Sequence, residues 1–265
     1  MLTLDCQVVS KKRQPRLPDG PVWVRTFPVT FLHDQTSERH RHDWHQLTYA
    51  VRGHLEVVTD DARRIVPADR AVWVPAGVEH VEVMRAPVSM RSIYVAPAAL
   101  RKKPGSCRTI AVTPLLRELV LHVSRIGALD RRDGEQARLA AVLLDLLAIA
   151  EDVPLELRSP RDPRARRFAD RVAADPGDDT PLPELARAVG SSLRTLERCF
   201  LADTGLTIGA WRRRVRLFHA VRLLDGGHPV TAVALDVGYA TTSAFSAAFT
   251  RELGRSPTGR RRVAA

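Results

Sequence analysis

The sequence has few cysteines and no long apolar run. Its three cysteines, Cys6, Cys107 and Cys199, are odd in number and far apart, which argues against a disulfide framework and fits a reducing compartment. No segment approaches the roughly 18 consecutive apolar residues of a membrane-spanning helix. A Lys-Lys-Arg run at 11–13 interrupts the only N-terminal stretch that could be considered a secretory signal. We therefore expect a cytoplasmic protein with no membrane partner.

Acidic residues are scarce relative to basic ones. Lysine and arginine together number 41 against 30 aspartates and glutamates, which gives a formal net charge of +11. The basic residues are mostly arginine, and much of the excess lies from Arg161 onward. Arginine neutralises phosphates and releases their counterions, so this balance predicts a polyanionic partner that is bound in a salt-sensitive way. The terminal run Arg260–Arg262 is more typical of a solvated tail.

The last hundred residues contain one pattern twice, at 182–200 and 230–249. In each copy a short apolar segment meets a glycine, Gly190 or Gly238, and a Ser or Thr suited to cap a helix follows. Glycine tolerates the positive φ that a sharp break between two helices requires, and the Ser or Thr oxygen accepts from the first amides of the second helix. The pattern predicts two helix-turn-helix units, which together can bind two stretches of one DNA duplex.

The second helix of each unit is predicted to have one polar face. In the first unit Leu193, Leu196 and Phe200 have helical spacing and should pack inward, and in the second Phe245 and Phe249 should do so. Arginine and glutamate can read base edges in the major groove, and small hydroxyl or methyl groups can contact thymine or phosphate. An ordinary helical bundle with solvated faces is the alternative. The residues that this pattern leaves on the outer faces are Arg194, Glu197 and Arg198 in the first unit, and Thr242, Ser243, Ser246 and Ala247 in the second.

This region resembles the DNA-binding domain of the AraC/XylS family of bacterial transcription regulators. The motifs that carry the resemblance are LARAVGSSLRTLERCF, TIGAWRRRVRLFHAVRLL and VTAVALDVGYATTSAFSAAFTRELGRSPTGRR. The resemblance implies a rigid helix that joins the two units, so that both recognition helices enter successive major grooves, roughly 34 Å apart, on one side of the DNA. It also implies that the outer residues named above meet the bases, and that RNA polymerase is a further partner.

The first hundred residues have the sequence pattern of short strands separated by turns. From Val22 to Val95, β-rich runs alternate with turn signals at Arg52-Gly53, Asp60-Asp61 and Pro75-Ala76-Gly77. This pattern predicts a small antiparallel barrel with space for a ligand between its strands.

Two motifs in this β-rich region, HRHDWHQLTYAVRG and DRAVWVPAGVEH, resemble those of the cupin fold, a double-stranded β-helix. We expect His40 and His42 to alternate on one strand and to converge with His80 on a divalent transition metal such as Zn, Ni, Fe or Cu. Gln46 stands where the cupin motif has an acid, and because an amide adds no charge, redox chemistry is in doubt. The alternative is that these histidines bind a small organic effector or one another. His45 should point to the other face.

Two apolar helices are predicted after the barrel, at Pro114–Ile126 and Glu135–Ile149. The second is so apolar that it packs either against the barrel or against the same helix of another chain, and the resemblance favours a homodimer. The fold class is therefore α+β in two domains. Its expected segments are an N-terminal arm (1–28), a cupin-like barrel (29–97), a helical dimerisation segment (110–150), a linker (151–162) and a DNA-binding domain (163–262).

Two hypotheses about function follow from these motifs. In the first, the chain is a DNA-binding transcription regulator whose cupin-like domain senses a small molecule or a metal and controls nearby genes. In the second, it is a metal-dependent cupin enzyme that carries a DNA-binding domain. The amide at Gln46 and the lack of an evident nucleophile and base favour the regulator, for which no catalytic residue is assigned.

Overall fold

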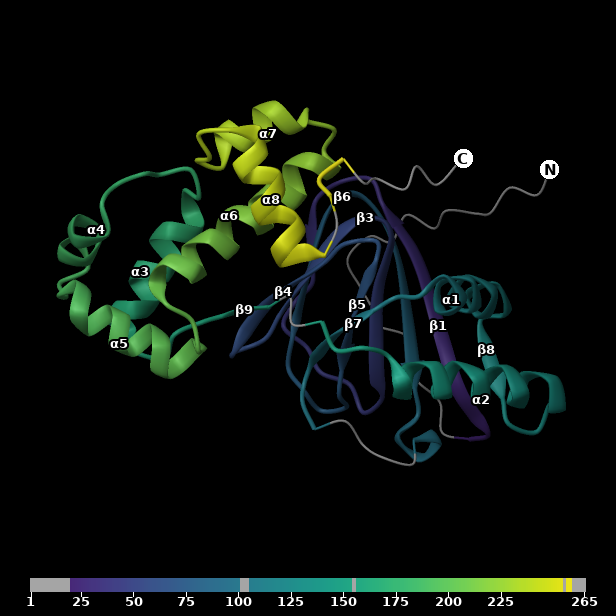
Figure 1. The fold of residues 1–265 in the computed structure, drawn as a ribbon. Coiled ribbons are helices and arrows are strands. Elements are labelled where there is room, and N and C mark those ends of the chain that lie inside the picture. Colours follow the sequence, from purple (N-terminus) through teal and green to yellow (C-terminus); the bar gives the residue numbers. More distant parts are fainter. Residues whose placement is uncertain (1–19, 101–104, 154–155, 255, 259–265) are drawn as a thin grey trace. The chain divides into compact units, whose positions relative to one another are not determined.

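The computed structural model describes residues 20–100, 105–153, 156–254 and 256–258, which form two compact units (Figure 1). The first unit contains most of the chain up to Glu156, and the second contains Leu157 onward together with the short segment Asp61–Arg63. Most of the expected N-terminal arm, with Cys6 and the run 11–13, lies outside the described residues, as do Pro154 and Arg260–Arg262. Within the described part of the chain, no helix is both long enough and apolar enough to cross a membrane.

Most of a nine-stranded sheet lies in the first unit, and its pairs β1–β6, β1–β8, β2–β6, β3–β5, β3–β6 and β5–β7 are antiparallel. Its main path runs β7-β5-β3-β6-β1-β8, while β2 pairs with β6, and β4 pairs with β3 and β9. The prediction of an antiparallel β domain followed by a helical domain is confirmed. The strands are β1 (Val22–Phe31), β2 (Gln35–Thr36), β3 (His45–Val58), β4 (Ala62–Val66), β5 (Arg70–Val74), β6 (Val81–Val95), β7 (Arg108–Ala111), β8 (Ala128–Asp130) and β9 (Glu156–Arg158).

Two long bent strands, β3 and β6, form the centre of this sheet. The sequence predicted a turn at Arg52-Gly53, but the structure continues β3 through it as a bulge, where the register against β6 shifts. Gly53 has a φ of +74°, and a Cβ there would lie 2.5 Å from the carbonyl oxygen of Pro87, so glycine is required. The bulge lets β3 pair with β5 along its first half and with β4 as well. The prediction of two separate strands was therefore wrong here.

Helices α1 (Pro114–Ile126) and α2 (Gly134–Ile149) cover one face of the sheet, close to their predicted bounds. Leu47 and Tyr49 of β3 point to this face, where they join buried residues of both helices in one apolar cluster. Thr113 and Asp133 cap the two helices by accepting from amides of their first turns. The short strand β8 lies between the helices, in the segment that the sequence analysis treated only as a break. A short 3₁₀ helix, Pro97–Ala99, follows β6.

The opposite face of the sheet carries a second apolar cluster and a polar group. Ala50, Leu55 and Val57 of β3 lie in this cluster with Val72, Val74 and Met90. Because side chains alternate along a strand, Gln46 and Thr48 share this face, and they pair across the sheet with Tyr94 and Ser92 of β6. All four are buried. The polar group thus lies at one end of a face that is otherwise apolar.

The second unit contains six helices among its described residues. Residues 151–162, predicted as a linker, include strand β9, which the sequence analysis did not predict. Phe200 of α5 packs edge-on against both Phe168 of α3 and Trp211 of α6, with ring centroids 5.6 and 5.4 Å away. The helices are α3 (Pro163–Ala174), α4 (Leu182–Ala188), α5 (Leu193–Thr204), α6 (Ile208–Asp225), α7 (Val230–Asp236) and α8 (Thr242–Leu253).

The two helix-turn-helix units have the same turn. Gly190 has a φ of +71° and Gly238 a φ of +77°, as predicted. After α4, the amides of Gly190 and Ser191 donate to the carbonyls of Arg187 and Ala186, and after α7 the amides of Gly238 and Tyr239 donate to those of Leu235 and Ala234. The predicted caps are also present, since Ser192 accepts from the amide of Thr195, and Thr241 from that of Ala244.

Candidate functional site

Three histidine side chains meet beside the start of β6. His80 is fully buried, and the ring centroids of His40 and His42 lie 4.2 and 5.2 Å from its own. One ring nitrogen from each of the three lies within 4.8 Å of the others. The structure therefore brings together the histidines of the two sequence motifs, and we call these three residues with Gln46 the histidine cluster.

His40 and His42 do not alternate on one strand, which corrects the sequence prediction. His40 forms an isolated bridge with His80, in which each backbone amide donates to the other's carbonyl at 3.0 and 2.9 Å. His42 lies in the loop that follows, where its carbonyl accepts from the amide of Gly77 at 2.9 Å, and β3 begins only at His45. Hydrogen bonds between two loops, and not strand alternation, make the imidazoles converge.

Each imidazole of the cluster has its Nδ1 against a backbone carbonyl. Nδ1 of His40 lies 2.8 Å from the oxygen of Glu38, that of His80 lies 3.0 Å from the oxygen of Val78, and that of His42 contacts the oxygen of Trp44. A carbonyl only accepts, so each Nδ1 carries the proton that it donates. In the neutral imidazole Nε2 is then left with a free lone pair, which is the arrangement that orients histidine as a metal ligand.

The side chain of Gln46 brings an oxygen to the same point as the three ring nitrogens. Its Oε1 lies 2.8 Å from Nε2 of His42 and 3.2 Å from Nε2 of His80. Its Nε2 donates in the other direction, to Oε1 of Glu82 and to Oγ of Ser92, each at 3.1 Å. The amide therefore turns its oxygen, which cannot donate, toward two imidazole nitrogens.

Burial favours the neutral form of His80. Burial lowers the pKa of His80 to about 4, and the nearby His40 and His42 lower it further by repulsion between positive charges. Nε2 of His42 and Nε2 of His80 both lie beside Oε1 of Gln46. Nε2 of His40 is buried, and no partner for it is found among the described residues. These four atoms fit a divalent transition metal, because three imidazoles and one neutral oxygen are a donor set that such ions accept.

His45 and the tryptophans lie outside the cluster. Nδ1 of His45 accepts from the amide of Ala76 at 3.1 Å, and its ring stacks on Trp73 at a centroid distance of 5.6 Å. Trp73 belongs to the apolar cluster under the helices, and Trp44 is buried. The prediction that His45 faces away from the cluster is confirmed.

Sequence reasoning missed the polar residues behind Gln46. Glu82 is only 7% exposed, and its Oε1 accepts from Gln46 and, at 2.8 Å, from Oγ1 of Thr48. Glu82 and Ser92 of β6 lie on the same side of the sheet, since both accept from Nε2 of Gln46. Burial raises the pKa of Tyr94, whose ring lies edge-on to His42, and the charge of Glu82 raises it further. The two-residue spacing of His80 and Glu82 was the available signal.

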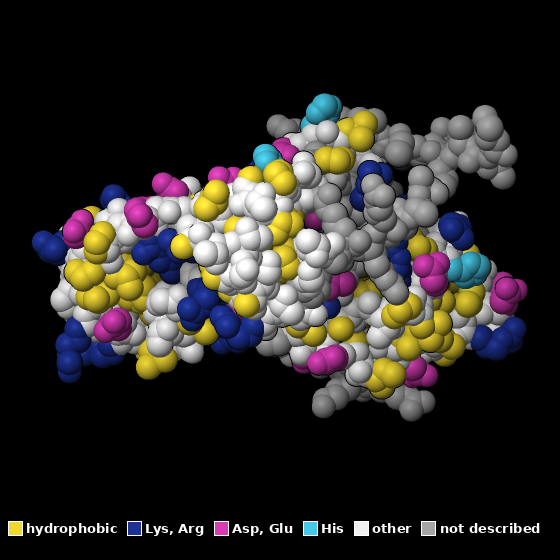
Figure 2. Space-filling view, turned by 45° about the horizontal axis from the view of Figure 1, so that its top comes forward, with side chains coloured by type: hydrophobic (Ala, Val, Ile, Leu, Met, Phe, Trp, Pro, Cys, Tyr) yellow, Lys and Arg dark blue, Asp and Glu magenta, His cyan; other side chains and the backbone are white. Residues whose placement is uncertain are grey.

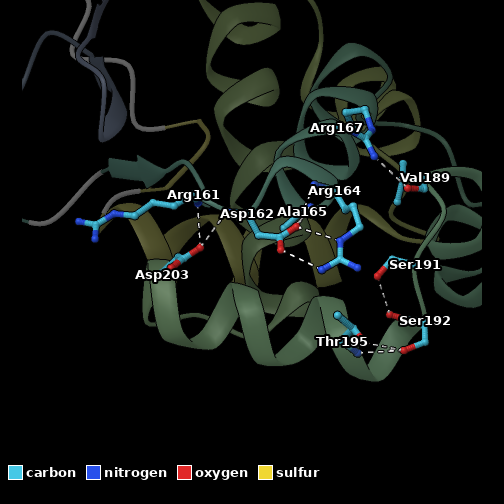
Figure 3. A network of polar contacts seen from close by, with 10 residues as sticks. All are labelled: Arg161, Asp162, Arg164, Ala165, Arg167, Val189, Ser191, Ser192, Thr195 and Asp203. Atoms are coloured by element: carbon cyan, nitrogen blue, oxygen red, sulfur yellow. Dashed lines mark hydrogen bonds and ion pairs between the residues drawn. The ribbon is translucent and has the colours of Figure 1, made fainter.

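In the second unit, the outer face of α5 is open to solvent. Arg194, Glu197 and Arg198 are exposed, whereas Leu196 and Phe200 are fully buried, as the spacing predicted. Polar contacts fix the helix at both ends (Figure 3). Ser192 caps its first turn, and near its last turn Oδ2 of Asp203 accepts from the amides of Arg161 and Asp162 at 2.7 and 3.3 Å. The exposed face therefore belongs to a firmly held helix.

The outer face of α8 carries smaller and uncharged side chains, in contrast to that of α5. Ser243 and Ala247 are exposed, and Thr242 and Ser246 are partly exposed. Phe245 and Phe249 on the opposite side of the helix are buried and pack together at a centroid distance of 5.5 Å. Figure 2 shows several groups of dark blue arginine side chains on the surface of this unit, at the left of the view.

The arginines at the start of α6 bind mainly the protein itself. Arg212 donates to the carbonyl of Thr180, and Arg214 lies 3.4 Å from the carboxylate of Glu252 on α8. Arg216 donates to three carbonyl oxygens, those of Pro176, Gly238 and Asp178, at 3.0 to 3.2 Å. Arg213 is exposed. Net charge alone therefore overstates how many of these arginines can meet phosphate.

Comparison with known proteins assigns both units. A protein-family model described as an AraC-like ligand binding domain matches residues 31–161, and a second family model, described as a helix-turn-helix domain, matches residues 185–262. The HTH-type transcriptional regulator NimR of Escherichia coli (strain K12) is 32% identical over 222 residues, which are 84% of this chain and 81% of that protein. The chain belongs to the AraC family of transcription regulators.

Other matches cover less of the chain or are less similar in sequence. The regulator RipA of Corynebacterium glutamicum is 40% identical over 101 residues, which are 38% of this chain and 30% of RipA. The crystal structure of unsaturated fatty acid bound ToxT from Vibrio cholerae is 11% identical, covers 91% of this chain and 95% of that chain, and has a TM-score of 0.38. NimR and RipA are both transcriptional regulators, so the enzyme hypothesis receives no support from these relatives. As a member of this family the chain binds DNA through its helix-turn-helix domain.

Proposed function

We propose that this AraC-family regulator senses a divalent transition-metal ion at the histidine cluster and changes the transcription of its target genes in response. The observation that carries the proposal is the convergence of one ring nitrogen from each of the three histidines, together with Gln46 Oε1 beside two of them. Imidazole nitrogens bind a metal through their unprotonated lone pairs, so an ion at their centre would take the place of any proton on these atoms. His40, His42, His80 and Gln46 would hold the ion, which would tie the loop of His42 to that of His80.

The DNA would be double-stranded and read by α5 and α8. Arg194, Glu197 and Arg198 have the chemistry for base edges, and their exposure on a capped, firmly held helix supports this role. Thr242, Ser243, Ser246 and Ala247 would make the second set of contacts, which are less base-specific because the side chains are small. RNA polymerase at the promoter would be the further partner of the cytoplasmic complex.

The regulator would act as a homodimer through its first unit. Leu115 of α1 is 61% exposed, and Val142 and Ile149 of α2 are 47% and 78% exposed. Figure 2 shows hydrophobic side chains gathered on the surface of this unit, at the right of the view. Both helices pack their other faces on the sheet, so the exposed apolar residues are free to meet a second copy.

The experiment that tests sensing removes two metal ligands at once. Promoter activity in cells, with and without added Zn²⁺, and DNA affinity of the purified protein are measured for a His42→Ala, His80→Ala double variant. His33→Ala, which removes an exposed imidazole, is the matched control. We expect the double variant to keep DNA affinity and lose the response, because coupling requires that the ion bind one state of the protein better than another.

A normal response to Zn²⁺ in the double variant would remove the histidine cluster from sensing. Loss of DNA affinity in the absence of metal would instead show that the histidines are structural. A response to small organic molecules but not to metals, abolished by the same variant, would replace the ion with an organic effector at the same residues.

A further inference from the structure

A buried carboxylate lies directly behind the histidine cluster. Glu82 does not contact the imidazoles in the structure, but its Oε1 accepts from Nε2 of Gln46 at 3.1 Å and from Oγ1 of Thr48 at 2.8 Å. The side chain is 7% exposed, and Gln46 and Thr48 are fully buried. The charge of this carboxylate is therefore transmitted to the cluster through a single amide group.

The amide of Gln46 has two possible orientations, and each satisfies a different neighbour. With the oxygen toward the imidazoles, as observed, the NH₂ group donates to Glu82 and Ser92. Turned over, the NH₂ group would donate to Nε2 of His42 and of His80, and the cluster would be complete without any cation. The turned amide would also place its oxygen against the oxygen of Glu82, and two acceptors at this distance repel.

We propose that Glu82 is the positioning residue that makes the cluster a metal site. Its carboxylate holds the Gln46 amide with the oxygen toward the imidazoles, and it supplies from the second layer the negative charge that the amide lacks. This inference rests on the proposed metal binding. It explains how a cluster without a carboxylate ligand suits a divalent ion, since residues that orient metal ligands commonly control affinity.

The test measures metal binding by the full-length protein with Zn²⁺ and Co²⁺ as probes. The affinity for Zn²⁺ is measured by competition with a coloured chelator, and the d–d spectrum of bound Co²⁺ reports the ligand set. Glu82→Gln keeps the shape of the side chain and removes its charge. We expect Zn²⁺ affinity to fall by about 10- to 100-fold and the Co²⁺ spectrum to lose the contribution of the amide oxygen.

Two further variants separate positioning from loss of structure. Thr48→Val removes the other donor to Glu82 and leaves the amide contact in place, so we expect Zn²⁺ affinity to stay within about threefold of the wild type. The exchange variant Gln46→Glu, Glu82→Gln moves the carboxylate into the ligand position and the amide behind it. We expect this variant to bind Zn²⁺ at least as tightly as the wild type.

The outcomes distinguish this inference from the proposed function. If the wild type binds neither Zn²⁺ nor Co²⁺, metal sensing itself is wrong. If the wild type binds metal and Glu82→Gln binds it equally well with the same Co²⁺ spectrum, the role of Glu82 is wrong while metal sensing stands. If Glu82→Gln fails to fold, the exchange variant decides, and weak binding by a folded exchange variant would overturn the inference.

Discussion

The two helix-turn-helix turns differ in what surrounds their glycines, and this difference leads to a sharp prediction. Gly190 and Gly238 have nearly the same positive φ, +71° and +77°, and the same hydrogen bonds. A Cβ at Gly190 would meet nothing within 4 Å, whereas a Cβ at Gly238 would lie 2.8 Å from Cζ of Arg216. Alanine at either position has the same backbone strain, so the pair isolates the contribution of Arg216.

The expected cost follows from two terms. A residue with a Cβ in the left-handed region costs about 1–2 kcal/mol, which is the whole effect of Gly190→Ala. In Gly238→Ala the guanidinium of Arg216 must also move away from the carbonyls of Gly238, Pro176 and Asp178. Loss of one such charge-assisted hydrogen bond costs about 1.5–3 kcal/mol. We therefore expect Gly238→Ala to cost about 3–4 kcal/mol, roughly 2 kcal/mol more than Gly190→Ala.

Amide hydrogen exchange of the full-length protein measures this cost helix by helix. In Gly238→Ala we expect faster exchange in α7 and α8 and unchanged exchange in the sheet of the first unit. In Gly190→Ala the smaller loss of protection should be confined to α4 and α5. Equal losses in the two variants would refute the reasoning, because they would show that Arg216 does not stabilise the second turn.

Three other predictions concern single side chains. Arg194→Ala and Arg198→Ala should each cost about 1–3 kcal/mol of specific DNA affinity with the fold intact, and unchanged footprints at fixed salt would show that this face does not read bases. Thr241→Ala, which removes the cap of α8, should lower the local stability of that helix by about 1 kcal/mol. Amide hydrogen exchange measures this stability, and an unchanged value would mean that the cap is not needed. The pKa of His80 is about 4 in the folded protein and 6.5 ordinarily, so the unfolded chain binds more protons between these values and stability rises with pH. Metal-free protein should therefore lose about 3 kcal/mol of stability between pH 7 and pH 4. Urea unfolding at the two pH values measures this loss, and an equal loss of stability in His80→Gln would contradict the assignment to His80.

The helical half of the molecule could be predicted from the sequence because its signals are local. The position of Gly190, the cap at Ser192 and the spacing of Leu196 and Phe200 all lie within a dozen residues of one another. They fix the turn, the start of the helix and its buried side without reference to the rest of the chain. The same holds for Pro114–Ile126, whose first residue and last residue were both predicted.

The sheet and its polar group could be predicted only in part because they depend on register. The Arg52-Gly53 pair suits a turn, but the approach of Pro87 from β6 makes it a bulge, and that approach is set by a strand far along the chain. Likewise the contact between Gln46 and Glu82 joins residues 36 positions apart. Sequence spacing identified the histidines, whereas the contact between Glu82 and Gln46 could be found only once β3 and β6 were aligned.

Helix α6, which lies between the two helix-turn-helix units in Figure 1, has a consequence for how binding sites on DNA can change. It spans 18 residues, or about 27 Å. Its Trp211 packs against Phe200 of the first helix-turn-helix unit, and its Arg216 donates to the carbonyl of Gly238 in the second. For the two-groove binding proposed above, a substituted base removes only the contacts made to that base. An insertion of about five base pairs turns the second groove to the far side of the duplex, where the rigidly joined reader cannot follow. Target promoters of this regulator should therefore diverge by substitution while keeping the length between their two half-sites.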